Sequence, residues 1–241
     1  MPDKDINIYG FNPVLEALEK EIPLRAVFIK RGKLGLKARK IINLCNEKNI
    51  PVIFKEPFFF KKENRIYWIL AQGSPVEFKS EEEFLKEPGE PIILLYKIQD
   101  PQNLGNLFRT ISALGFSKVA LTVEDTAPIS EVVSRASEGA INFLNFSNIK
   151  KPLNFLKMAR ERGFKIYGAT MEGVPAWKIE FEKNLVLILG SEGKGIPEPY
   201  KKLCDNLISI PLKGPVKSLN VSTAGGIILY EIGRKLFPSS F

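Results

Sequence analysis

LVLILGSEGKG, residues 185–195, and LISIPLKGPVK, residues 207–217, are two apolar runs that each end in a polar loop. SLNVSTAGGIILYE follows as residues 218–231 and has the composition of a helix with a capped start. Short apolar runs bounded by Gly or Pro are typical of strands buried on both faces of a parallel sheet. Ligands in such sheets collect at the carboxyl ends of the strands, so the two loops are the first candidates for a site.

The residues before this region continue the same pattern. Apolar runs are expected to form strands at 92–96, 118–123, 143–146 and 164–168, and amphipathic segments to form helices at 103–114, 129–140 and 153–162. Strands that alternate with helices of this length indicate a mostly parallel sheet with helices on both faces. The predicted fold class is therefore α/β.

A second, smaller α/β unit is expected at residues 1–78. Asn12-Pro13 is a helix start, 33–49 has helical periodicity, and short strands are expected at 24–29, 51–54 and 66–70. Residues 79–90 are rich in Glu and end in Pro88-Gly89, which is typical of a hinge. The predicted organisation is a domain at 1–78, a linker at 79–90 and a second domain at 91–241.

The charge balance favours a nucleic acid partner. The 241 residues carry a formal net charge of +8, which suits a polyanion, although Lys- and Glu-rich thermophile proteins have similar compositions. Basic residues without any acid gather on a loop that enters the expected second helix, and the candidates for contact with RNA are Lys30, Arg31, Lys33, Lys37 and Arg39. A solvated helix face is the alternative interpretation of this patch.

The absence of histidine from the sequence excludes several classes of enzyme. Ser-His-Asp and Cys-His nucleophilic sites and His-ligated zinc all need this residue. The two cysteines, Cys45 and Cys204, are far apart and are expected to be reduced thiols, so no metal site is predicted. No apolar run is long enough to span a bilayer, and the N-terminus lacks the features of a signal peptide, so no membrane association and a cytoplasmic location are expected.

Three polar stretches are candidates for chemistry. Asn103 is expected to cap a helix in which Arg109 lies about one and a half turns further on, either aimed at a ligand or paired with an acid such as Asp100. The spacing of the loop at Gly190 is neither that of a dinucleotide fingerprint nor that of a P-loop. Glu192 in this loop is expected to accept a hydrogen bond from a ligand or to cap the next segment, and Ser218 and Asn220 suit helix capping.

Together these stretches resemble the SpoU (TrmH) family of RNA 2'-O-ribose methyltransferases. Asn103-x-Gly105-x-x-x-Arg109, LGSEGKG at 189–195 and IPLKGPVKSLNVS at 210–222 occur in the order and at the spacing of the family's motifs. Residues 8–20, IYGFNPVLEALEK, are similar to the start of the L30e-like domain of the RlmB branch. Members of that branch often carry histidine where Asn12 stands here. The resemblance implies a SPOUT-class domain with a deep trefoil knot behind a small L30e-like domain.

The resemblance also implies a cofactor, a reaction and a set of residues. S-adenosylmethionine would bind in the knot loops of a homodimer, and a ribose 2'-oxygen, found in RNA and not in DNA, would attack its methyl group. The residues implied for catalysis and for ordering the site are Arg109, Asn103, Glu192, Ser218 and Asn220, and those implied for cofactor binding are Gly190, Ile210, Leu219, Thr170 and Leu212. The expected substrate is a guanosine in 23S rRNA, with tRNA and a non-catalytic RNA-binding protein as alternatives.

Overall fold

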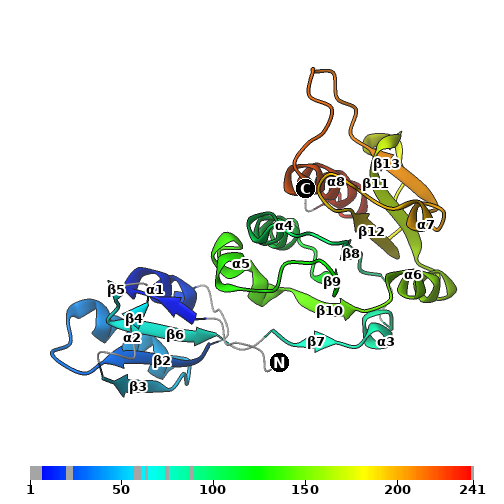
Figure 1. Ribbon diagram of the computed structural model, residues 1–241. Helices are drawn as coiled ribbons and strands as arrows, with labels where there is room; N and C mark the ends of the chain where they lie inside the picture. The colour runs from blue at the N-terminus through cyan, green and yellow to red at the C-terminus, as the bar shows by residue number, and fades with distance from the viewer. Residues whose placement is uncertain are drawn as a thin grey trace. The chain divides into compact units, whose positions relative to one another are not determined.

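The chain forms two units, residues 1–76 and residues 77–241, in the computed structural model (Figure 1). The structure describes residues 7–19, 24–56, 61–62, 65–73, 76–86 and 89–239. Each unit has its own sheet and its own apolar core. No helix in these described ranges is both long and apolar enough to cross a bilayer.

A parallel sheet forms the centre of the second unit, as the alternation of strands and helices predicts. Every neighbouring pair of strands in it is parallel. The order across the sheet is β13 (Asn206–Ser209), β11 (Lys165–Pro175), β12 (Leu185–Leu189), β8 (Ile92–Leu95), β9 (Lys118–Thr122), β10 (Asn145–Ile149) and β7 (Phe78–Lys79). The strands β8, β9 and β12 are buried along their whole length, which explains why β8, β12 and the centre of β9 are apolar without alternation.

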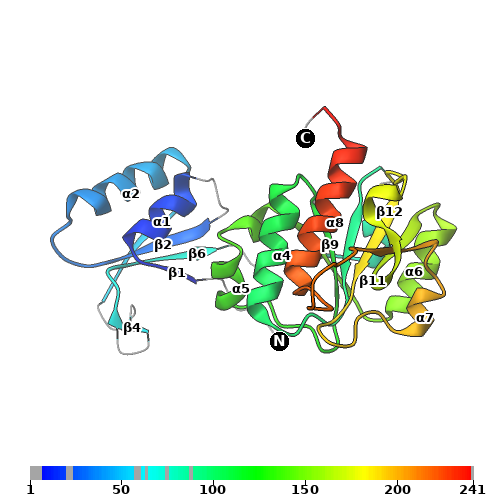
Figure 2. The same ribbon diagram turned by 90° about the horizontal axis from the view of Figure 1, so that it is seen from above.

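Helices cover both faces of this sheet. The helices are α3 (Glu81–Phe84), α4 (Pro101–Ala113), α5 (Glu131–Ala136), α6 (Pro152–Glu161), α7 (Glu198–Lys201) and α8 (Val221–Leu236), with 3-10 turns η2 (Ala140–Phe143) and η3 (Ala176–Lys178). Phe84 of α3 and Phe155 of α6 pack in one core with Ile188 of β12. On α8, a methyl group added to Gly225 would lie 2.7 Å from Leu107 of α4 and 2.9 Å from Leu189 of β12. Glycine here lets α8 lie directly against α4 (Figure 2).

Several element boundaries differ from those predicted. Helix α4 begins at Pro101 and is capped by Asp100, whose carboxylate accepts the amide of Gln102 at 2.7 Å. The prediction that Asn103 caps this helix is therefore wrong, since Pro at the first position starts the helix two residues earlier. Strand β11 continues past Gly168 to Pro175, with a break in its register against β13 between Ala169 and Val174.

Residues 79–90 differ from the linker expected from their composition. Ser80 caps α3 in a capping box with Glu83, and the carboxylate of Glu83 has a lowered pKa because it accepts hydrogen bonds from Ser80. Phe84 and Leu85 are buried in the core of the second unit. The first part of the segment is thus a short helix, which its composition also permits, and Phe84 and the following Leu85 place it in the second unit.

The first unit has a four-stranded sheet in the order β1 (Asn7–Tyr9), β6 (Ile69–Gly73), β2 (Leu24–Lys30) and β3 (Val52–Lys55), and a short hairpin of β4 (Lys61–Lys62) and β5 (Arg65–Ile66). The strand predicted at 66–70 is thus divided between β5 and β6. Helices α1 (Phe11–Glu19) and α2 (Leu36–Glu47) lie on one side of the sheet (Figure 2). The deep trefoil knot of the second unit stays a prediction from the family resemblance.

Candidate functional site

Three loops of the second unit meet at one edge of its sheet. Residues 96–100 follow β8, residues 190–197 follow β12, and residues 210–220 follow β13. These strands run parallel, so their carboxyl ends share an edge, which is where α/β sheets bind ligands. The two loops that the sequence singles out are therefore at the same edge, together with the start of α4.

Asn103 lies in α4, directly after the first of these loops, and its carboxamide bonds to the other two. It donates to Oε1 of Glu192 at 2.6 Å, and its Oδ1 accepts from Nδ2 of Asn220 at 2.9 Å. Asn220 in turn caps α8, because its Oδ1 accepts from the amide of Ser222 at 2.8 Å. Asn103 is only 7% exposed. The structure thus brings three of the five predicted catalytic residues into one hydrogen-bonded network and confirms the prediction that Asn220 caps a helix.

The loop that begins at Gly190 is closed upon itself. The amide of Gly195 donates to the carbonyl of Ser191 at 2.9 Å, and the two residues form a β-bridge. A Cβ atom on Gly190 would lie 2.4 Å from the carbonyl carbon of Gly195. No side chain fits at position 190 without a shift of the backbone, and the closed loop holds Glu192 against Asn103.

The remaining predicted cofactor residues lie at the same strand ends. Ile210 is half-buried and follows β13, while Leu212 and Leu219 are 40% and 38% exposed in the loop that also holds the exposed Ser218. Thr170 lies where β11 loses its register with β13, and its hydroxyl donates to the carbonyl of Glu172. These apolar side chains follow a strand that ends at the same edge as the closed loop at Gly190. Such side chains are a suitable lining for an adenine ring.

Arg109 is separate from the network of Asn103. Its Nη1 pairs with Oε1 of Glu138 at 2.7 Å, and both side chains are more than half exposed. The alternative that Arg109 pairs with an acid is therefore confirmed, but the acid is Glu138 and not Asp100, which caps α4 instead. No hydrogen bond in residues 89–239 connects Arg109 to the carboxamide of Asn103.

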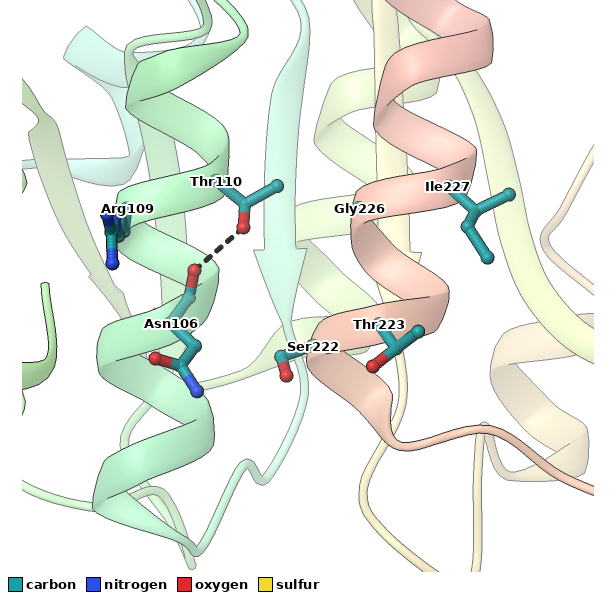
Figure 3. A pocket seen from close by; sticks show the side chains of 7 residues that line it. All are labelled: Asn106, Arg109, Thr110, Ser222, Thr223, Gly226 and Ile227. Atoms are coloured by element: carbon teal, nitrogen blue, oxygen red, sulfur yellow. Dashed lines mark hydrogen bonds between the residues drawn. The ribbon is translucent and has the colours of Figure 1, made fainter.

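Arg109 lines a shallow pocket of about 490 Å³ between α4 and α8, together with Asn106, Thr110, Ser222, Thr223, Gly226 and Ile227 (Figure 3). The hydroxyl of Thr110 donates to the carbonyl of Asn106 at 2.9 Å. Hydroxyls and a guanidinium at an open surface suit a sugar-phosphate better than an apolar ligand.

Sequence reasoning missed Glu138. It lies in the turn after α5 with a positive φ of 48°, a conformation that is uncommon for a residue with a side chain. Its neighbours Ser137 and Gly139 signal a turn, but the pairing with Arg109 depends on how α5 packs against α4. The sequence could therefore have indicated the turn at Glu138 but not its ion pair with Arg109.

Other titratable groups near this edge are held in their neutral or paired forms. Burial raises the pKa of the Cys204 thiol to about 12 and that of the Tyr200 phenol to about 12. The pKa of Lys97 is raised, chiefly by its hydrogen bond to Asp125. Cys204 is therefore protonated at neutral pH and is unsuited to act as a nucleophile.

The basic patch predicted in the first unit is partly neutralised. Lys37 donates to Oδ1 of Asn12 at 3.1 Å, and Arg31 lies 3.7 Å from a carboxylate oxygen of Glu56. Lys30 lies 3.9 Å from the ring centre of Trp68. Lys33 and Arg39 are exposed.

Comparison with known proteins finds relatives along almost the whole chain. YacO of Bacillus subtilis, named as a TrmH family tRNA/rRNA methyltransferase, is 26% identical over 239 residues, which are 96% of each chain. An AdoMet-bound rRNA methyltransferase from Sinorhizobium meliloti has a TM-score of 0.76 at 22% identity and covers 97% of this chain and 88% of its own. The TrmH/SpoU tRNA modifying enzyme of A. aeolicus has a TM-score of 0.58 at 27% identity and covers 66% and 82%.

Two family models match the chain. The model for RNA 2'-O ribose methyltransferase substrate binding matches residues 7–62, within the first unit. The SpoU rRNA methylase model matches residues 90–230, which is more than half of the chain and includes every residue of the network around Asn103. The chain therefore belongs to the SpoU rRNA methylase family.

Proposed function

We propose that this protein is an S-adenosylmethionine-dependent RNA methyltransferase that modifies a ribose 2'-hydroxyl. The observation that carries the proposal is the network of Asn103, Glu192 and Asn220, which ties the start of α4 to two strand-end loops in a chain of this family. The substrate-binding model matched by the first unit is named for 2'-O ribose methyltransferases. The Sinorhizobium meliloti structure, which has the same fold, is described as AdoMet-bound.

The residues at the sheet edge fit this cofactor. Gly190 lets the backbone of Gly195 close tightly against it, because a Cβ there would collide with Gly195, and Ile210, Leu212 and Leu219 supply apolar walls. When bound, S-adenosylmethionine supplies an activated methyl group. Asn103 holds the loops that carry these residues in one arrangement, so that little ordering is left to occur on binding.

Arg109 is proposed to hold the RNA. A guanidinium binds phosphate through two parallel hydrogen bonds, and its exposed ion pair with Glu138 can be exchanged for a phosphate at small cost. In this role Arg109 aligns the ribose hydroxyl with the methyl donor, and correct orientation of the reacting groups by itself accelerates a reaction. Arginine is a poor proton acceptor at its usual pKa, so alignment is its principal role here and assistance to proton removal a secondary one.

The substrate that we propose is a guanosine in 23S rRNA, in the cytoplasm. The rRNA methyltransferase from Sinorhizobium meliloti aligns with 97% of this chain, whereas the tRNA modifying enzyme of A. aeolicus aligns with 66%. The alignment with the rRNA methyltransferase therefore extends over the first unit of this chain as well as the second. Modification of tRNA is the second candidate, since the relative YacO is named for both substrates.

A homodimer is proposed, with the site completed across its interface. Ile227 and Tyr230 are 40% and 49% exposed on α8, and Ile227 lines the pocket that also contains Arg109. The loop at 211–220 is exposed throughout. A second copy that covers this side of α8 would bury these apolar groups and enclose the pocket.

The proposal is tested by incubating the protein with labelled S-adenosylmethionine in two separate reactions, one with total bacterial rRNA and one with total bacterial tRNA. Label in rRNA, mapped to a single ribose 2'-oxygen, is the expected result, and label in tRNA alone would establish the second candidate. Calorimetry should detect binding of S-adenosylhomocysteine to the protein and no binding of ATP or NAD. A protein that binds RNA, takes up no S-adenosylhomocysteine and transfers no label is the non-catalytic alternative, and the proposed activity would then be abandoned.

A further inference from the structure

The sheet of the first unit has two faces of different character. Val27, Ile29 and Ile69 point to the side covered by α1 and α2 and belong to the core with them. Residues at alternate positions form the opposite face, where Ala26, Phe28 and Leu70 make a separate cluster lined by Tyr9 and Tyr67. The rings of Tyr9 and Tyr67 are 5.1 Å apart. The helix-free face is therefore rich in aromatic side chains.

A tryptophan and two lysines lie in a row at one end of this face. The amide of Lys30 donates to the carbonyl of Trp68 at 2.9 Å, and Lys30 is paired with Lys55 in the register of β2 and β3. The ammonium of Lys30 lies 3.9 Å from the centre of the Trp68 ring. The Trp68 ring thus has the ammonium of Lys30 beside it, and Lys55 lies next to Lys30 in the neighbouring strand.

Trp68 is 51% exposed although it is a large apolar side chain. Lys30 contacts its ring, yet half of the residue's surface is open to solvent. Exposed aromatic rings on a sheet face, next to cations, are the usual means by which proteins stack unpaired bases of RNA while they hold the phosphates. Bases within an A-form duplex are already stacked on each other, so this arrangement selects unpaired nucleotides.

We propose that Trp68, with Lys30 and Lys55, is a stacking site for an unpaired nucleotide of the substrate RNA. Trp68 lies outside the segment that matches the substrate-binding family model, residues 7–62. Of the basic residues that the sequence favours for contact with RNA, the site includes Lys30, and it adds Trp68 and Lys55, which that set does not contain. This inference rests on the proposed function for the identity of the partner, and the net charge of +8 favours RNA over a protein surface.

The two tryptophans of the chain, Trp68 and Trp177, allow a direct spectroscopic test. In the Trp177→Phe variant, Trp68 is the sole reporter. A short single-stranded RNA oligonucleotide should quench its fluorescence and the same RNA as a blunt duplex should not, because only free bases stack on the ring. Unchanged fluorescence at RNA concentrations that saturate binding by anisotropy would overturn the proposal. Equal quenching by the two RNAs would overturn the preference for unpaired nucleotides.

Substitution gives the second test, in the full-length protein. Trp68→Ala should weaken single-stranded RNA binding by roughly tenfold and Trp68→Tyr by less than about threefold, since a smaller aromatic ring still stacks. Phe54→Ala is the matched control, because Phe54 is 42% exposed at the same end of the sheet and is paired with Ile29, which faces the helices. Equal losses in Trp68→Ala and Phe54→Ala would show a general effect on the fold of the unit and refute the stacking site.

Transfer kinetics separate this inference from the proposed activity. Trp68→Ala should raise the KM for RNA and leave kcat and the affinity for S-adenosylhomocysteine unchanged. If the wild-type protein methylates RNA and Trp68→Ala has the same KM, the stacking site is wrong and the activity stands. If the wild type methylates no RNA, the activity is wrong, and the fluorescence and affinity measurements still decide whether Trp68 stacks bases.

Discussion

The two polar side chains of α4 that the sequence singles out, Asn103 and Arg109, lie in opposite environments. Asn103 is buried, and its carboxamide donates to Glu192 and accepts from Asn220. Arg109 is exposed, and its partner Glu138 is exposed as well. A buried hydrogen-bonded network fixes one geometry, because breaking it leaves polar groups without partners. An exposed ion pair is worth little and can be exchanged for a ligand.

This difference assigns separate tasks to the two ends of the helix. The buried end should control the shape of the loops that are proposed to bind the cofactor, and the stability of the fold. The exposed end should control the reaction with RNA and leave the cofactor and the fold almost unaffected. Substitutions at each end therefore test the assignment.

Arg109→Ala should give the largest effect on turnover. Loss of the guanidinium should lower kcat by at least about a hundredfold, the range found when one group that binds developing or transferred charge is removed. The affinity for S-adenosylhomocysteine, measured by calorimetry, should stay within about twofold of the wild type. Arg109→Lys retains the charge without the paired donors and should recover only part of the activity.

Wild-type turnover in Arg109→Ala would contradict a role of Arg109 in the reaction. Loss of both turnover and cofactor binding would contradict the division of tasks between Asn103 and Arg109.

Gly190→Ala should give the next largest effect, on the cofactor. Its new methyl group would lie 2.4 Å from the carbonyl carbon of Gly195, so the closed loop has to open. We expect the affinity for S-adenosylhomocysteine to fall by roughly tenfold or more, with a loss of stability of about 1–3 kcal/mol. Gly35→Ala is the control, because a Cβ there meets no atom within 4 Å. Unchanged affinity in Gly190→Ala would show that this loop does not contact the cofactor.

Asn103→Ala tests the network itself. The substitution leaves Glu192 and Asn220 without their partner, and a buried polar group that loses its hydrogen bond costs about 1–3 kcal/mol. Denaturant unfolding should show this loss, and calorimetry should show weaker cofactor binding, because the loops are no longer held together. The control Asn106→Ala, one turn further along α4, should lower the free energy of unfolding by less than about 0.5 kcal/mol. Equal stability of the two variants would contradict the structural role of Asn103.

The sequence predicts the strands of the second unit well because a strand buried on both faces is a continuous apolar run, as in β8 and β12. It fails where a few residues outweigh the composition. Glutamates conceal that Phe84 belongs to the core, and Pro101 moves the start of α4 away from Asn103.

The site divides in the same way. The motif residues Asn103, Glu192 and Asn220 are far apart in sequence, and the family pattern predicts their proximity although no local spacing does. Glu138 belongs to no motif that the sequence displays. It reaches Arg109 only because α5 packs against α4 and a left-handed turn directs its carboxylate. Such a pairing depends on tertiary structure and lies beyond sequence patterns.

Glu138→Gln should give the smallest effect, and it should strengthen RNA binding, whereas the other substitutions weaken activity, cofactor binding or stability. The carboxylate of Glu138 occupies Arg109 and repels the phosphate that is proposed to replace it. Its removal should tighten RNA binding by about twofold to fivefold at low salt, and the gain should shrink as salt screens the repulsion. Glu124→Gln makes the same change of charge at an exposed acid that lies 3.8 Å from Lys97 and should tighten binding less. If Glu138→Gln instead lowers turnover while Glu124→Gln does not, Glu138 orients Arg109 for the reaction, and the exposed end of α4 is a fixed pair like the buried one.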